Sequence, residues 1–303
     1  MAVTGALPAR FRRPRVLVVG CGDVGTRALP RLNGVRVLAL TSSPQRVPVL
    51  RAAGVVPLLG NLDQPASVRR LAGLAQRVLH LAPPPSGPAD ATRRDDPRTR
   101  TLVRALARGR KPLALVYGST SGVYGDCAGA WVDETRPVRP QTARAHRRVA
   151  AENTLRHWGR RAGVPVAVLR IPGIYAPDRE GGTPRERLLR GSPVLHAEDD
   201  VFTNHIHADD LARACVRALL RAPVQRVFNV CDDTELRMGD YMDLAADLYH
   251  LPRPPRVTRA EAAAQLSPMV LSFMGESRRL RNTRLKRELG LRLCYPTVVQ
   301  GLR

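Results

Sequence analysis

Short apolar runs alternate with amphipathic stretches along the first half of the chain. Residues 16–19 form a continuous valine-rich run, which is typical of a central strand buried on both faces of a parallel sheet. The same pattern predicts further strands at 35–40, 55–59, 78–82, 113–117 and 164–170, and helices at 24–32, 45–53, 65–72, 97–108 and 142–162. Repeated strand–helix units of this length predict an α/β fold with a doubly wound parallel sheet and right-handed crossovers.

The second half of the chain is less regular. Residues 177–204 are rich in proline, glycine and charge, as expected of a lobe that covers one end of the sheet. A helix at 208–221, with Asp209 and Asp210 in its first turn, and a strand at 226–230 are predicted to return to the sheet. Further helices are predicted at 241–249, 259–266 and 283–289.

A glycine-rich loop with the sequence GCGDVG connects the first strand to the first helix. In a loop that binds a dinucleotide, Gly20 permits the tight turn, Gly22 lets the backbone approach the pyrophosphate, and Gly25 lets the helix pack on the strand. Asp23 and Val24 open the helix, whose N-terminal N–H groups favour phosphate. The loop therefore predicts a nicotinamide-dinucleotide site. The resulting organisation is a basic arm (1–14), a dinucleotide-binding domain (15–176, completed by about 205–231) and a smaller C-terminal lobe (177–204 and 232–303).

The end of the second strand bears on the choice of cofactor. An NAD-selective fold usually places an acid there to hold the ribose 2′-hydroxyl, and this chain has Thr41, Ser42 and Ser43 instead, followed by Arg46. Arg46 is weak evidence for NADP. In a chain this rich in arginine, a five-residue window contains an arginine by chance about half the time. The missing acid is stronger evidence. We expect NADP as the cofactor, contacted by Ser42 and Arg46, with NAD as the alternative.

A run of hydroxyl residues follows the fifth predicted strand. Ligands bind beyond the carboxyl ends of parallel strands, so Ser119, Thr120, Ser121 and Tyr124 are expected to face the reactive end of the cofactor. A hydroxyl there can bond a substrate carbonyl or alcohol. Serine, threonine and glycine also simply form turns after strands, and the spacing alone does not choose between the two interpretations.

These motifs, in this order, resemble the extended short-chain dehydrogenase/reductases of the NAD-dependent epimerase/dehydratase superfamily, in particular an atypical branch with a GCGDVG loop. The matching segments, over nearly the whole chain, also include GNLD (60–63), LHLAPPP (79–85), STSGVYGD (119–126), LRIPGIYAP (169–177), HIHADDLA (205–212), VFNV (227–230) and ELGLRLCYP (288–296). The resemblance implies a Rossmann domain with a lobe that closes over the substrate, and an oxidoreductase or epimerase acting on a carbonyl or secondary alcohol.

Several positions take their expected roles from this resemblance. Thr120 occupies the place of the catalytic Ser/Thr, and Asn61 stands where the family usually has an aspartate near the adenine. Leu62, Leu81 and Ala82 lie in the matching segments and complete the expected cofactor contacts.

The family's Tyr–Lys pair is missing. Aligning Glu152 with the glutamate four residues beyond the family's lysine puts Arg144 in the tyrosine's place and Arg148 in the lysine's. A guanidinium stays protonated at neutral pH, so Arg148 can hold the nicotinamide ribose but Arg144 cannot donate a proton. We therefore expect a non-standard active site with Thr120, Tyr124 and Arg148 as candidate catalytic residues. The alternative is a non-catalytic NADP(H)-binding sensor or scaffold.

Other candidate chemistry is weaker. Tyr175 and His146 are more typical of packing or surface residues than of proton donors. His205 and His207 are spaced for one face of a strand, but the resemblance places His207 where a strand ends and a helix begins, so no metal site is expected.

Composition and charge add little to the predicted fold and function. The net charge is +23, and of the 49 basic residues only Lys111 and Lys286 are lysines. The arginines are spread along the chain, and aromatic residues for base stacking make up only 4%. We expect nucleic acid to bind nonspecifically if at all, a small-molecule, anionic substrate to be attracted, and an arginine-biased genome to explain much of the charge.

The location and assembly state are further expectations. Five cysteines without CxxC spacing predict reduced thiols, and no apolar run approaches the roughly 20 residues of a membrane helix. The first residues lack the cleavage site of a signal peptide, so a cytoplasmic protein is expected. The family often forms a homodimer through a helix pair, but the helix at 142–162 is rich in arginine, which leaves dimerisation open.

Overall fold

The structure, a computed structural model, describes residues 13–303, apart from the side chains of residues 268 and 269, so most of the predicted arm lies outside the described residues. Its centre is a seven-stranded sheet with the strand order β12-β7-β5-β4-β1-β2-β3, and every pairing is parallel. The strands are β1 (Arg15–Val19), β2 (Arg36–Thr41), β3 (Val56–Leu59), β4 (Arg77–His80), β5 (Ala114–Thr120), β7 (Val166–Ile171) and β12 (Arg226–Asn229). The order reverses between β1 and β4, which is where such sheets bind ligands.

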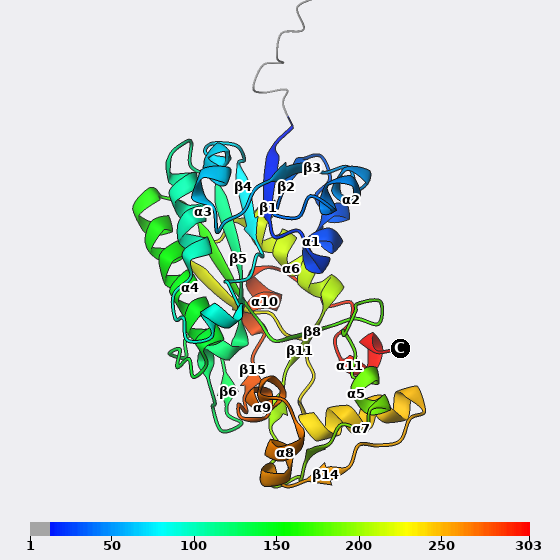
Figure 1. Cartoon of the computed structure of the whole chain (residues 1–303). Helices are drawn as coiled ribbons and strands as arrows, with labels where there is room; N and C mark the ends of the chain where they lie inside the picture. The colour runs from blue at the N-terminus through cyan, green and yellow to red at the C-terminus, as the bar shows by residue number, and fades with distance from the viewer. Residues whose placement is uncertain (1–12) are drawn as a thin grey trace, which may run out of the picture.

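Helices cover both faces of the sheet (Figure 1). On one face lie α1 (Asp23–Ala28) and α6 (Ala208–Arg221), and on the other α3 (Pro97–Ala107) and α4 (Ala143–Ala162), while α2 (Arg46–Ala52) connects β2 to β3. Side chains of β1 alternate between the two apolar cores: Val16 and Val18 belong to one, Leu17 and Val19 to the other. The predicted doubly wound α/β fold is confirmed.

Three predicted boundaries differ for local reasons. The first helix ends at Ala28 and continues as a short 3₁₀ turn (Leu29–Arg31), because Pro30 has no N–H for the helical ladder. The segment after β3 is a 3₁₀ helix (Pro65–Leu71) rather than an α-helix. The strand expected to reach residue 82 ends at His80, because the N–H groups of Leu81 and Ala82 both donate to the carbonyl of Val19, at 2.8 and 2.9 Å.

The long helix α4 matches its prediction, and local residues determine where it begins and ends. Thr142 caps it by accepting a hydrogen bond from the N–H of Ala145 at 3.1 Å, and Gly163 ends it with a φ of +65°. Arg148 and Glu152 lie one turn apart on this helix, so both can reach the sheet.

Most of the remaining elements gather at one end of the sheet, in the lower part of Figure 1. They form the two-stranded sheets β8–β11, β9–β14, β10–β13 and β6–β15 with the helices α5 (Arg185–Leu189), α7 (Met238–Tyr249), α8 (Arg259–Gln265), α9 (Pro268–Met274) and α11 (Val298–Gly301). The helix α10 (Thr283–Glu288) lies instead beside the central sheet, against β12. The strands are β6 (Trp131–Val132), β8 (Gly173–Tyr175), β9 (Val194–Leu195), β10 (Phe202–Thr203), β11 (His205–His207), β13 (Leu236–Arg237), β14 (Arg256–Val257) and β15 (Arg279–Leu280). The limits given for the predicted lobe stay a prediction. Among residues 13–303, no helix has both the length and the apolar character needed to span a bilayer.

Candidate functional site

Two adjacent hollows lie at the carboxyl ends of the central strands. We call the first, of about 430 Å³, the loop groove, and the second, of about 790 Å³, the central cavity. Gly20, Gly22 and Leu81 line both, so the glycine loop lies between them. This arrangement suits a long ligand that passes over the loop.

The three glycines of the loop differ in what surrounds them. Gly20 has a φ of +85°, and a Cβ there would collide with the backbone of Leu81 and Ala82. A Cβ on Gly25 would lie 3.3 Å from the carbonyl oxygen of Gly20. A Cβ on Gly22 would meet nothing within 4 Å. Gly20 and Gly25 are therefore needed by the fold itself, whereas the space beside Gly22 is open to a ligand.

The loop groove contains the residues expected around the adenosine half of a cofactor. Besides Gly20 and Gly22, it is lined by Ser42, Arg46, Asn61, Leu62, Leu81 and Ala82. The Arg46 guanidinium donates from Nη2 to the carbonyl of Cys21 at 2.6 Å, which fixes it beside the glycine loop. Arg98 also lines the groove and was not expected there; its guanidinium binds both oxygens of Asp63, at 2.9 and 2.7 Å.

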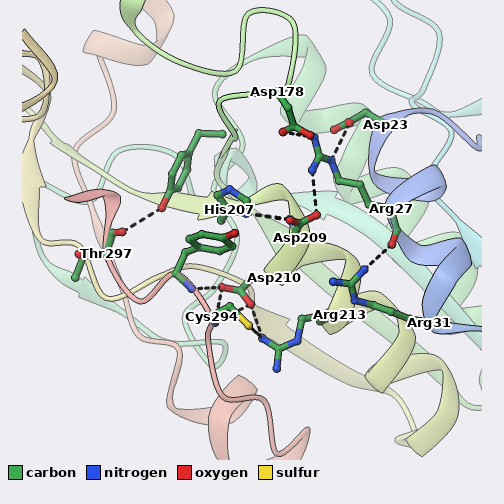
Figure 2. A network of polar contacts seen from close by, with 12 residues as sticks. Asp23, Arg27, Arg31, Asp178, His207, Asp209, Asp210, Arg213, Cys294 and Thr297 are labelled. Atoms are coloured by element: carbon green, nitrogen blue, oxygen red, sulfur yellow. Dashed lines mark hydrogen bonds and ion pairs between the residues drawn. The ribbon is translucent and has the colours of Figure 1, made fainter. Parts of the chain in front are cut away.

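Asp23 and Val24 line the central cavity rather than the loop groove, as does Gly25. The Asp23 carboxylate is engaged with protein groups: Arg27 bonds it at 2.9 Å, and Arg179 also pairs with it. Figure 2 shows that Arg27 lies between three carboxylates, those of Asp23, Asp178 and Asp209, the last two at 2.7 and 3.0 Å. Only the backbone of Asp23 is thus free to face a phosphate.

Thr120, at the end of β5, lines the central cavity. Its hydroxyl accepts a hydrogen bond from the N–H of Gly122 at 3.3 Å and keeps its own proton for a ligand. The neighbouring Ser119 hydroxyl is committed, because it donates to Glu152 at 2.5 Å, and Glu152 forms a buried ion pair with Arg170 at 2.8 Å. Thr120 is therefore the better placed of the two to bind a substrate oxygen.

The geometry does not favour Tyr124 as a proton donor. Its side chain is only 1% exposed, and it is not among the residues that line the central cavity. Its hydroxyl donates to Asn229 at 2.8 Å, and burial raises the pKa of Tyr124 to about 12. The short 3₁₀ helix that follows Thr120 (Ser121–Tyr124) turns this ring into the core. Tyr175 and His146 are likewise absent from the cavity lining.

Arg148 lines the central cavity among neutral partners. From Nη1 it donates to the carbonyl of Gly118 at 2.7 Å and to the hydroxyl of Tyr117 at 3.2 Å. Burial, and then the charge of Arg148, lowers the pKa of the nearby His80 to about 3, so that imidazole is neutral. Arg148 thus presents a positive charge that no carboxylate neutralises within the described chain.

Two further guanidinium groups line the cavity without a carboxylate partner among residues 13–303. That of Arg144 lies 5.0 Å from the ring centre of Phe273 in α9. Arg187, in α5, has a buried Nη2 with no hydrogen-bond partner, and burial lowers the pKa of this side chain. By contrast, Arg278 is paired with Glu276 at 2.8 Å. The cavity wall therefore carries an excess of positive charge.

Glu276 is the cavity carboxylate beside Thr120. A Cβ placed on Gly122 would lie 3.7 Å from Thr120 Oγ1 and 3.8 Å from Glu276 Oε2, so both oxygens border the same small volume. No tyrosine, lysine, histidine or cysteine of the described chain lines the cavity. Glu276 and Asp23 are its acidic groups, and Asp23 is already held by two arginines.

Comparison with known proteins agrees with this geometry. Residues 16–231 match the family described as the NAD dependent epimerase/dehydratase family. The chain belongs to this family. Among curated relatives of the family, a dTDP-glucose 4,6-dehydratase of Mycolicibacterium smegmatis is 26% identical over 244 residues, which is 73% of each chain. The chain spans between 24% and 73% of the lengths of the curated relatives it matches.

Solved structures share the whole architecture. A conserved protein of unknown function from Silicibacter pomeroyi DSS is 32% identical, with a TM-score of 0.75 over 95% of this chain and 96% of the other. A UDP-glucose 4-epimerase from Thermotoga maritima has a TM-score of 0.76 over 95% and 96% at 20% identity, which shows the fold alone. The predicted membership of the epimerase/dehydratase superfamily is confirmed, while the GCGDVG branch stays a prediction.

Within this family framework, sequence reasoning located the glycine loop, Thr120 and Arg148 but missed Arg187 and Glu276. Both lie far from the motifs in sequence, and neither has a distinguishing local pattern among so many charged residues. Arg144 was identified as a departure from the family pattern, without its position on the cavity wall being foreseen. His205 and His207 pack against aromatic rings, with His207 stacked on Tyr295 at 3.7 Å between ring centres.

Proposed function

We propose that this protein is an NADP(H)-dependent oxidoreductase or epimerase-type enzyme that acts on a carbonyl or secondary alcohol of an anionic small molecule. The observation that carries the proposal is that the loop groove and the central cavity share Gly20, Gly22 and Leu81 in their linings, and that Thr120 and Arg148 line the central cavity. A bound nicotinamide dinucleotide supplies hydride transfer at its nicotinamide ring.

NADP rather than NAD is supported by the loop groove. No carboxylate follows β2, and the Ser42 hydroxyl and the Arg46 guanidinium border the groove where a ribose 2′-phosphate would lie. Replacing Arg46 by alanine is expected to weaken NADPH binding and to leave NADH binding unchanged. An equal loss for both cofactors would contradict the preference.

The proposed roles follow from the contacts described above. Arg148 would hold the nicotinamide ribose. The Thr120 hydroxyl would donate a hydrogen bond to the substrate oxygen. In the oxidation direction the hydroxyl proton of the substrate would pass to water or to Glu276, whose Oε2 also accepts a hydrogen bond from Arg278 at 2.8 Å; in reduction the same groups would return the proton. Glu276 is suited to this because it lies beside the same volume as Thr120.

The substrate class is proposed from charge and from the family. Arg144 and Arg187 lack carboxylate partners in the described chain, and a phosphate or carboxylate of the ligand would provide them. The curated relatives act on sugar nucleotides such as dTDP-glucose, whose diphosphate has this chemistry. We also propose a cytoplasmic location, which agrees with five unpaired cysteines.

A screen of keto-sugar nucleotides and simpler carbonyl compounds with NADPH, read at the nicotinamide absorbance, tests the proposal. For an active substrate, Arg187→Gln should raise KM and leave kcat nearly unchanged, whereas Glu276→Gln should lower kcat and alter its pH profile. The exposed Arg190, also on the α5 side of the lobe, provides a control substitution, Arg190→Gln.

A second candidate function is a non-catalytic sensor of NADP(H). It is favoured by the lack of a tyrosine, lysine or histidine in the lining of the central cavity among the described residues. Tight NADPH binding without turnover on any member of the panel would support the sensor and contradict the enzyme.

A further inference from the structure

The edge of the sheet where the parallel strands begin is opposite the cofactor site, at the top of Figure 1 where β1 starts. In a doubly wound sheet, the helices that cross between strands run back against them, so their last turns lie at this edge. The segments that join each helix to the next strand therefore form one continuous surface.

The last turns of these helices are basic. That of α2 contains Arg51, that of α4 contains Arg160 and Arg161, and Arg108 is the C-cap residue of α3. All four side chains are exposed. A cation in this position is favoured by the helix dipole, which accounts for part of the pattern.

The joining segments add cations that the helix dipole does not explain. Arg36 lies at the first residue of β2, and Arg110 and Lys111 lie between α3 and β5; all three are exposed. Segments 29–36, 51–56, 69–77, 107–114, 160–166 and 221–226 contain neither acidic nor aromatic residues. A high arginine content would not by itself exclude acids from every one of them.

Few carboxylates of the described residues lie near this edge of the sheet. Among the ion pairs of residues 13–303, only Glu288 neutralises one of these cations, binding Arg226 at 2.8 and 2.6 Å. Acidic residues otherwise lie near the carboxyl ends of the strands or in the lobe, as Asp23 and Glu276 do. We call the exposed set Arg36, Arg51, Arg108, Arg110, Arg160 and Arg161 the basic edge.

We propose that the basic edge binds double-stranded nucleic acid through its phosphates, without reading sequence. Guanidinium groups match phosphate oxygens in a bidentate geometry. The six strands from β7 to β3, about 4.8 Å apart, spread these groups over roughly 24 Å, which suits a linear polyanion. The lack of aromatic residues in the joining segments excludes the base stacking by which single strands are held.

An anionic membrane fits this surface less well. The exposed apolar side chains there are Leu113, Leu220 and Val224, of which only Leu220 and Val224 lie near each other in the sequence. A helix that lies in a membrane surface offers a continuous apolar face instead. Binding to vesicles is therefore an outcome that the test must distinguish.

The test measures the anisotropy of a labelled random-sequence DNA duplex of about 30 base pairs as salt is raised. The variant Arg108→Gln, Arg110→Gln, Arg160→Gln, Arg161→Gln removes four charges of the basic edge. The control Arg185→Gln, Arg190→Gln, Arg253→Gln, Arg281→Gln removes four exposed charges from elsewhere, so that both proteins have the same net charge.

The proposal expects the wild type to bind the duplex at about 150 mM salt. The plot of the logarithm of the DNA association constant against the logarithm of salt concentration should become less steep in the edge variant. Its slope should become less negative by about 0.9 for each phosphate that the protein no longer neutralises, up to about 3.6. The slope of the control should change little. The pair Arg160→Gln, Arg161→Gln should give about half this effect and serves if the fourfold variant does not fold.

Three results would overturn the proposal. They are no binding of the duplex at this salt concentration, an equal loss in the edge variant and the control, or binding to phosphatidylserine vesicles without binding to the duplex. None of these results depends on cofactor binding or turnover.

Discussion

Thr120 and Tyr124 are four residues apart and have opposite surroundings. The Thr120 hydroxyl borders the central cavity, whereas the Tyr124 ring lies in the core with its hydroxyl on Asn229. The sequence placed both after the same strand, and only the 3₁₀ turn between them separates their directions. The two residues therefore offer a matched pair of substitutions.

Thr120→Val keeps the size of the side chain and removes its hydrogen bond to the substrate oxygen. We expect kcat to fall by about a hundredfold, as for loss of a positioned donor. The free energy of unfolding should fall by no more than about 1 kcal/mol, because the N–H of Gly122 loses its acceptor. Tyr124→Phe should leave kcat unchanged and lower the free energy of unfolding by about 1–2 kcal/mol, because Asn229 loses its buried partner. Steady-state kinetics and urea unfolding of both variants test this. A large loss of kcat in Tyr124→Phe would contradict it and would show that Tyr124 takes part in catalysis.

At the scale of elements, strands and the glycine loop could be predicted because their signals are local. The run at 16–19 and the GCGDVG sequence each depend on a few adjacent residues. The partners of charged side chains could not be predicted, because they come from distant segments. Asp23, for example, pairs with Arg179, which is 156 residues away. In a chain with 49 basic residues, no local pattern distinguishes such partners or the buried Arg187.

The junction between α1 and the loop after β8 depends on one arginine. Arg27 bonds carboxylates of Asp23, Asp178 and Asp209, which would repel one another without it (Figure 2). Arg27→Gln should lower the free energy of unfolding by about 2 kcal/mol, the range for a lost hydrogen-bonded charge. The control Arg31→Gln should change it by less than about 0.5 kcal/mol, since Arg31 is exposed and bonds only the carbonyl of Arg27. Equal effects in urea unfolding would contradict this role.

At the scale of the whole molecule, charge is divided between the two ends of the sheet. The cofactor end combines arginines with carboxylates, whereas the end where strands begin has cations and almost no acids. Overall stability should depend on pH through the few acids that are buried.

Asp232 is the clearest of these, because burial raises its pKa to about 7 from an ordinary 3.8. Between these values the folded protein binds a proton that the unfolded chain has released, so Asp232 makes stability fall as pH rises from about 4 to 7. Asp232→Asn should remove this contribution. The variant's free energy of unfolding relative to wild type should increase over that range and stay level above it. Urea unfolding across this pH range measures the difference, and a difference independent of pH would contradict the assignment.

Calorimetric titration of NADPH and NADH into the wild type and Gly22→Ala measures whether the glycine loop binds NADP(H). Nothing lies within 4 Å of a Cβ on Gly22, so the variant should keep the wild-type melting temperature. We predict one cofactor site per chain that binds NADPH more tightly than NADH. NADPH should bind at least about tenfold more weakly to Gly22→Ala, because the methyl group meets the pyrophosphate. A folded wild type that binds neither cofactor, or a Gly22→Ala variant that binds as tightly as wild type, would contradict this prediction.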